Sequence, residues 1–266
     1  MSTNERASKL YQKLNWTEQL LSDLKLQCDA FLRTHPYAFS SRLEPETNCR
    51  VYFLTTVKEV PAPISFLTGD IIQNLRGALD HLAYQLVLIG TSKESTKIYF
   101  PIGGKGDEAY KEKLKDYTKW LKKDVLEAFE NLRPYKEGNA IFWQLNELNN
   151  INKHRVPITT GSALNSMNIG MNLQGVVDQL ASEEPLWRNV RVPDFVVSPS
   201  DRKFPLKVGD KLFQSGPNEP ECQQEFGFGI AFGEPNVVDG APIVNTLQQM
   251  FDLVKSTIQD FTTFLD

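Results

Sequence analysis

The sequence predicts an α+β fold, in which a helical bundle core carries a small antiparallel β-sheet inserted before the last helix. Three observations predict it. The first 155 residues are mainly amphipathic helical patterns, the next stretch is rich in glycine, proline and short apolar alternations, and the end returns to helical periodicity. We therefore expect a helical domain with one early strand over residues 1–157, a strand-rich segment over 158–240, and a C-terminal helix over 241–266 that packs back on the helical domain.

The N-terminal elements follow from hydrophobic spacing. Apolar residues at helical spacing predict a helix from about Glu5 to Thr34, which His35-Pro36 ends. CRVYFLTTVKEV then alternates β-branched or aromatic residues with polar ones, so a strand is expected from Arg50 to Val60. PAPISF should separate that strand from a helix over Asp70–Gly90, with Thr68 and Asp70 at its start.

The later elements are assigned in the same way. An extended piece is expected over Lys97–Ile102, and helices over Glu108–Trp120, Lys123–Leu132, Ala140–Lys153 and Pro242–Leu265. Short antiparallel strands are expected in NIGMNLQGVV, RVPDFVVS, FPLKVGDKLF and CQQEFGFGIAF, so that the inserted sheet lies between about Thr159 and Gly233.

Composition and charge limit the kind of protein. The formal net charge of -4 gives no general attraction to polyanions, so nucleic-acid binding would need a local basic patch. Cys28, Cys49 and Cys222 form no CxxC pair and are expected to be reduced thiols. No signal peptide or long apolar segment is present, and we expect a cytoplasmic protein without membrane contact.

Several familiar motifs are missing. The glycines at 103, 104 and 106 precede a helix, but they match no phosphate-binding fingerprint and are more typical of a turn. Lysines over 111–123 alternate with carboxylates at i,i+3 and i,i+4, as in a solvated helix face. The three histidines, His35, His81 and His154, have no metal-ligand spacing. We expect neither a metal nor a cofactor.

The segment GDIIQNLRGALDHLAYQL carries unusual polar residues for an amphipathic helix. At 100° per residue, one face holds Asp70, Asn74, Gly77 and His81. Arg76 and Asp80 are four residues apart and can form an ion pair. His81 could act as an acid or base beside a cation that stabilises an oxyanion.

A second segment, FWQLNELNNINKHR, has a similar pattern. Asn146, Asn150 and either Lys153 or His154 line one face of the expected helix. The two polar helices could face each other across a cleft. Alternatively, their polar stripes could form a hydrogen-bonded network that holds the helices in register, because buried polar groups must be paired.

The spacing R-x-x-x-x-H in Arg76-Gly77-Ala78-Leu79-Asp80-His81 resembles the motif of HEPN-domain ribonucleases. In that family two protomers form a composite, metal-independent site that cleaves RNA. The resemblance implies that Arg76 holds the phosphate and that His81 moves protons. Gly77 departs from the family, which often has a polar residue after the arginine.

A wider similarity covers about half of the chain. The succession GDIIQNLRGALDHLAYQLV, YFPI, LRPY and LNELNNINKHR resembles a family of bacterial proteins of about this size that has no assigned function. The similarity implies that the two polar helices belong together, and it names no reaction.

Two functions are therefore considered. The first is a dimeric, HEPN-like ribonuclease or phosphate-directed enzyme with RNA as its partner. The second is a non-catalytic binding or interaction protein, such as a sensor or defence component, in which the same residues are structural or hold a small anionic ligand. The candidate catalytic residues are Arg76 and His81, and the candidate binding residues are Asn74, Asp80, Asn150, Lys153, His154 and Arg155.

Overall fold

The computed structural model confirms the α+β class. It describes residues 3–91, 97–104, 106–154, 157–168, 170–197, 204–217 and 224–265. Within these residues the chain forms seven α-helices and two three-stranded antiparallel sheets, one of which is inserted between the fifth and the last helix. The elements belong to two compact units: a helical unit of Met1–Gln27, Ala62–Thr159 and Glu234–Asp266, and a sheet unit of Cys28–Pro61 and Thr160–Gly233.

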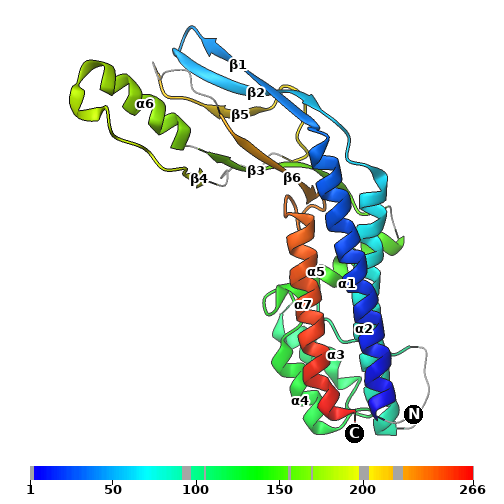
Figure 1. The fold of residues 1–266 in the computed structure, drawn as a ribbon. Coiled ribbons are helices and arrows are strands. Elements are labelled where there is room, and N and C mark those ends of the chain that lie inside the picture. Colours follow the sequence, from blue (N-terminus) through cyan, green and yellow to red (C-terminus); the bar gives the residue numbers. More distant parts are fainter. Residues whose placement is uncertain are drawn as a thin grey trace. The chain divides into compact units, whose positions relative to one another are not determined.

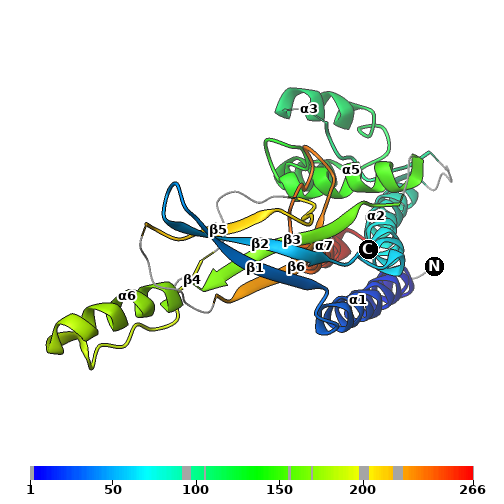
Figure 2. The same ribbon diagram turned by 90° about the horizontal axis from the view of Figure 1, so that it is seen from above.

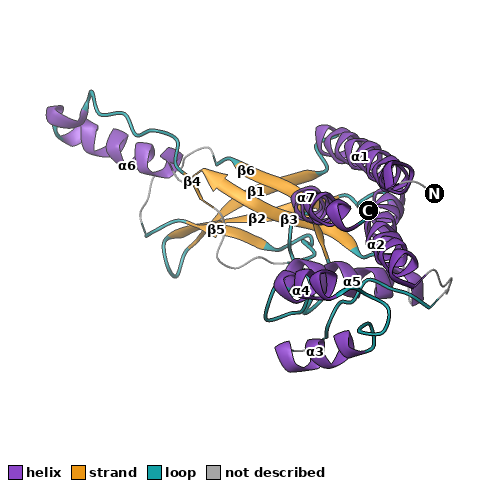
Figure 3. Cartoon of the chain, turned by 90° about the horizontal axis from the view of Figure 1, so that it is seen from below, coloured by secondary structure: helices purple, strands orange, loops and turns teal. Residues whose placement is uncertain are grey.

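The helical unit is built around α2, which packs against α5 and α7 (Figures 1 and 3). Its helices are α1 (Thr3–Arg33, of which the part up to Gln27 belongs to this unit), α2 (Ala62–Thr91), α3 (Asp107–Lys115), α4 (Lys123–Leu132), α5 (Ala140–His154) and α7 (Ile243–Phe261), followed by the 3-10 turn η2 (Thr262–Phe264). Each long helix buries an apolar stripe. In α7 this stripe includes Leu247, Met250, Phe251, Val254 and Ile258.

Aromatic rings form a central part of the core of the helical unit. Phe100, from the extended chain before α3, packs edge-on to Phe129 of α4 at 5.2 Å and stacks with Phe142 of α5 at 5.7 Å. Phe129 also contacts Phe261 of α7 at 4.9 Å. The four side chains are at most 2% exposed. Phe100 therefore links α4 and α5, and Phe129 extends the cluster to α7. The position of Phe100 depends on how the chain around it is held.

Helix α2 begins eight residues earlier than expected. PAPISF is largely the first turn of the helix and does not separate it from the strand, because proline is tolerated in a first turn, where backbone N–H groups have no partner in the helix. Thr68 is fully buried and its hydroxyl donates to the Ile64 carbonyl, so it does not cap the helix start. The other predicted helices agree with α1, α4, α5 and α7 to within a few residues. The helix predicted over Glu108–Trp120 is shorter in the structure, because α3 ends at Lys115.

The sheet unit contains two sheets. Its strands are β1 (Tyr37–Glu44), β2 (Cys49–Val57), β3 (Thr160–Asn168), β4 (Val196–Val197), β5 (Lys211–Gln214) and β6 (Phe226–Phe232). One sheet has the order β1-β2-β5 and the other β4-β3-β6 (Figure 2). The expected single inserted sheet is thus wrong in one respect, because β5 pairs with the early strand β2.

The two sheets share one small core. Leu54 of the first sheet, Leu164 of the second and Leu206 are buried together. Tyr37 packs on Phe228 with ring centroids 4.5 Å apart, and its hydroxyl donates to the Ser162 hydroxyl at 2.9 Å. Since these contacts join early and late strands, the early chain folds with the strand-rich segment and not with the helices.

Two elements of the sheet unit differ from the sequence prediction. β1 was not expected, because most of its residues are exposed and its apolar residues do not alternate. NIGMNLQGVV was expected to be a strand, but the chain forms helix α6 (Gly170–Glu183) there. Asn168 explains the change, since its side-chain oxygen accepts from the Gly170 N–H at 3.0 Å and supports the helix start.

Helix α6 belongs to a protruding arm, defined here as residues 170–195. Its ends meet at Asn168, whose oxygen also accepts from the Phe195 N–H at 3.2 Å and whose nitrogen donates to Asp194 at 2.9 Å. Between Leu173 and Val196 no side chain is buried, and Leu186 is 82% exposed. The arm is therefore held at its base and contributes little to the core.

Candidate functional site

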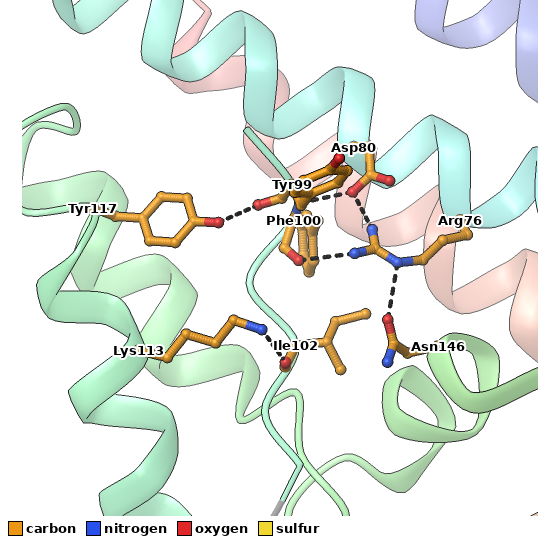
Figure 4. Close-up of polar contacts among 8 residues, drawn as sticks. All are labelled: Arg76, Asp80, Tyr99, Phe100, Ile102, Lys113, Tyr117 and Asn146. Carbon is orange, nitrogen blue, oxygen red and sulfur yellow. Dashed lines mark hydrogen bonds and ion pairs between the residues drawn. The ribbon is translucent and has the colours of Figure 1, made fainter. Parts of the chain in front are cut away.

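Arg76 of α2 is the centre of a buried polar network (Figure 4). Its Nε donates to Asn146 Oδ1 of α5 at 3.3 Å, its Nη1 to Asp80 Oδ1, and its Nη2 to the Phe100 carbonyl at 3.2 Å. The Arg76 side chain is only 7% exposed. The i,i+4 ion pair expected between Arg76 and Asp80 is confirmed, and each guanidinium nitrogen already donates a hydrogen bond inside the protein.

Asp80 has a second structural role. The oxygen that pairs with Arg76 also accepts from the backbone N–H of Phe100 at 2.8 Å. Arg76 and Asp80 therefore bind the carbonyl and the amide of the same residue, as Figure 4 shows. Both side chains lie on one face of α2, because residues four apart are neighbours on a helix.

Further side chains bind the backbone on either side of Phe100. The Tyr117 hydroxyl donates to the Tyr99 carbonyl at 2.5 Å, and Lys113 Nζ donates to the Ile102 carbonyl at 2.7 Å. Burial and the charge of Arg76 lower the pKa of Lys113. The network thus recognises a stretch of extended chain, residues 99–102, and that stretch is the protein's own.

Helices α2 and α5 lie antiparallel and close together. Asn152 donates to the Gly69 carbonyl at 3.3 Å, and a Cβ at Gly69 would lie 2.5 Å from the Asn152 side-chain oxygen. Farther along, Asn146 contacts Arg76. The two polar helices therefore pack directly at these points, as the structural interpretation of their stripes required. On the same helix, Asn149 is 3% exposed and its side-chain oxygen has no hydrogen-bond partner among the described residues.

The remaining candidate residues lie elsewhere. Asn74 donates to the Asp70 carbonyl within α2, while Asn150, Lys153 and His154 are exposed on α5. Arg155 lies outside the described residues.

The two histidines of the polar helices do not meet. The Gly69–Asn152 contact fixes how α2 and α5 are aligned, and at 1.5 Å per residue His81 and His154 lie roughly 20 Å apart along the helix axis. The structure therefore does not bring the two histidines together across a cleft.

Helix α1 runs beside α2 in Figures 1 and 2, and the charge of Lys13 on α1 acts on His81 of α2. Lys13 of α1 lies across Gly77: its Cε and Nζ are each 3.2 Å from the point that a Cβ on Gly77 would occupy. Partial desolvation and the positive charge of Lys13 lower the pKa of His81, and Asp80 partly opposes this effect. One helical turn away, Arg6 of α1 donates to the Gln85 side chain at 2.8 Å.

Lys13 was not among the residues predicted from the sequence. A signal was present, since the basic residues Arg6, Lys9 and Lys13 follow one another at helical spacing on α1. On the predicted polar face of α2, Gly77 lies next to Lys13 and His81 is influenced by its charge.

Comparison with known proteins assigns no relative. No protein family, curated protein or solved structure matches the chain significantly. The resemblances inferred from the sequence therefore remain hypotheses, and any function has to be inferred from the residues themselves.

Other features of the chain offer less chemistry. The Gly106 N–H at the start of α3 donates to Glu137 at 2.8 Å, and Asp107 and Glu108 make the first turn acidic, which disfavours a bound phosphate. Over the described parts of the chain there is no group of three or more potential metal ligands, and no helix has the length and apolarity needed to cross a membrane.

The described cysteines are buried and unpaired, as expected for reduced thiols. Burial and the charge of Asp29 raise the pKa of Cys28 to about 11, which keeps it protonated and unreactive near neutral pH. Cys222 lies outside the described residues.

Proposed function

We propose that this protein is a non-catalytic binding or interaction protein, and that the network of Arg76, Asp80 and Asn146 is part of its scaffold. One observation carries the proposal: all three Arg76 nitrogens donate to protein acceptors, and the side chain is almost completely buried. A phosphate in solvent would therefore have little access to this arginine, whose side chain is 7% exposed.

The geometry of α2 also supports a scaffold role for Arg76. Residues five apart on an α-helix point about 140° away from each other. Accordingly, Arg76 contacts α5 and residue 100, whereas His81 is influenced by Lys13 of α1. Within one chain the arginine and histidine of the R-x-x-x-x-H motif do not share one pocket.

A HEPN-like ribonuclease remains the competing hypothesis, and the exposure of His81 favours it, because an accessible imidazole can transfer protons. It also requires Arg76 to reach a phosphate, for example in a dimer. The two hypotheses predict different effects for substitutions at the two positions.

An RNA-cleavage assay without divalent metal, combined with chemical unfolding, separates them. We expect no cleavage by the wild-type protein. Arg76→Lys should reduce the free energy of unfolding by about 2–4 kcal/mol, because lysine cannot replace the forked hydrogen bonds of a buried arginine. His81→Ala should change it by less than about 0.5 kcal/mol, as is usual for an exposed side chain.

The opposite result is equally clear. Metal-free cleavage by the wild type that disappears in a normally folded His81→Ala variant would reject the scaffold proposal in favour of the enzyme. A contaminating nuclease is recognised because its activity would persist unchanged in His81→Ala.

A further inference from the structure

We propose that Lys13 of α1 and His81 of α2 form a binding site for a small phosphate-bearing anion on the surface of the helical unit. The inference rests on the proposed function, since it names the class of ligand that such a binding protein would hold. It assigns to Lys13 a role that the sequence motifs do not suggest.

Lys13 carries a positive charge without a counter-ion among the described residues. Lys13 is partly buried, and burial lowers its pKa, yet no described carboxylate or hydrogen-bond acceptor contacts its ammonium group. The exposed lysines of α3 and α4 behave differently: Lys111, Lys115 and Lys123 each pair with a carboxylate three or four residues away. A desolvated cation without a counter-ion is unfavourable, and a bound anion would relieve that cost.

Lys13 also packs closely against α2. The end of its side chain lies over Gly77, where any side chain would press against it at 3.2 Å. Glycine is a poor residue for the middle of a helix, costing about 0.5–1 kcal/mol relative to alanine. Here it leaves room for the ammonium group to lie across α2, one turn before His81.

His81 is accessible and can supply a second hydrogen-bond donor. His81 is exposed, so its imidazole can donate to a ligand from solvent while Lys13 donates from the neighbouring helix. Asp80, the nearby carboxylate, is already bonded to Arg76 and the Phe100 amide. Arg6 holds Gln85, which lies one turn beyond His81 on α2. The charges of Lys13 and of the committed Asp80 act on His81, and Lys9 continues the basic stripe of α1 between Lys13 and Arg6.

Phosphate suits this arrangement better than a carboxylate. Its charge and several acceptor oxygens can receive donors from two helices at once. Because binding an anion favours the protonated imidazole, phosphate should raise the pKa of His81. The same chemistry would accept inorganic phosphate or the phosphate of a small phosphomonoester.

The test is an NMR titration of the histidine rings in the full-length protein at constant ionic strength. His81→Gln identifies the His81 signal among the three histidines. Separate titrations use inorganic phosphate and adenosine monophosphate, with chloride as the control anion. We expect saturable shifts with phosphate and none with chloride, and tighter binding of one phosphate source identifies the natural ligand class.

Matched variants assign the site. Lys13→Met should weaken binding at least tenfold, whereas Lys25→Met, an exposed lysine on the same helix, should leave it unchanged. Gly77→Ala should also weaken binding because its methyl group displaces Lys13, while thermal unfolding confirms that the variant remains folded.

A shift that never saturates, or saturation that is equal in Lys13→Met and Lys25→Met, would overturn the assignment. Such a failure is distinct from failure of the proposed function, which depends on RNA cleavage and on the stability of Arg76→Lys. Absence of phosphate binding together with absence of cleavage would reject only the anion site.

Discussion

At the scale of single residues, the most informative feature is the use of charged side chains to hold backbone. Arg76 and Asp80 form hydrogen bonds with the backbone carbonyl and the backbone N–H of Phe100, and the Phe100 ring packs in the aromatic core. The Arg76–Asp80 ion pair, which the sequence predicted from i,i+4 spacing, thus holds the backbone that places an apolar ring.

Asp80→Asn tests this explanation. The substitution removes the negative charge beside a guanidinium that is 7% exposed, and an uncompensated buried charge is costly. We expect a loss of about 2–4 kcal/mol in the free energy of unfolding, measured by urea denaturation. Asp70→Asn, at an exposed carboxylate on the same helix, should change it by less than about 0.5 kcal/mol.

A second prediction concerns pH. The pKa of His81 in the folded protein lies below its usual value of 6.5, so near that pH the unfolded chain binds more protons. His81 therefore opposes folding increasingly as the pH falls below about 6.5, and the free energy of unfolding should rise from pH 5 to pH 7. Urea denaturation across this range should show a shallower rise in His81→Gln and in Lys13→Met. An unchanged slope in both variants would contradict the lowered pKa of His81 and the influence of Lys13 on it.

Part of the site could be predicted from the sequence. The Arg76–Asp80 pair follows from i,i+4 spacing, which is a property of one helix. Asn146 and Phe100 could not be identified as partners of Arg76, because they lie on other parts of the chain and meet it only through tertiary packing. Lys13 could not be identified as a neighbour of α2 for the same reason, although its helical spacing from Arg6 was visible in the sequence.

At the scale of elements, long helices were predictable and short exposed elements were not. α1, α2, α5 and α7 bury apolar stripes with a clear period. β1 is an edge strand whose stability comes from pairing with β2, so its own residues carry little pattern. α6 could have been recognised, since Leu173, Val176, Val177 and Leu180 have helical spacing.

The arm gives an element-scale prediction. Replacing residues 170–195 with Asn-Gly should change the free energy of unfolding by less than about 1 kcal/mol, because Asn168 and Val196 are already paired across the strands and the arm buries almost nothing. Urea denaturation and circular dichroism would measure it. Leu164→Ala, in the core of the sheet unit, is the contrasting variant and should lose about 2–4 kcal/mol. If the shortened protein fails to fold, the arm is structurally required.

At the scale of the whole molecule, neither unit is continuous in sequence. The helical unit combines three chain segments and the sheet unit two. This arrangement explains why an early strand was assigned to the wrong neighbours: hydrophobic periodicity reports the type of an element and contains no information on which distant segment it will join.

The order of segments also predicts a folding dependence. α7 is the last helix, yet it supplies Phe261 to the aromatic core and packs on α2 and α5. A chain ending at Gly233 should therefore lose the cooperative unfolding transition of the helical unit, as measured by urea denaturation. Phe261→Leu retains α7 and should lose only about 1–2 kcal/mol. Cooperative unfolding of the truncated chain would show that α7 is dispensable.

The hydrogen bonds that hold the backbone of Phe100 also have an evolutionary consequence. Among homologous chains, Arg76, Asp80 and Asn146 should be retained together or replaced together by apolar residues, because losing one leaves the others buried and unpaired. Tyr99 should vary freely, since only its carbonyl is recognised and its side chain is 56% exposed. If Arg76 is invariant among these homologues, the invariance would reflect selection for folding, and it would not by itself indicate a reaction.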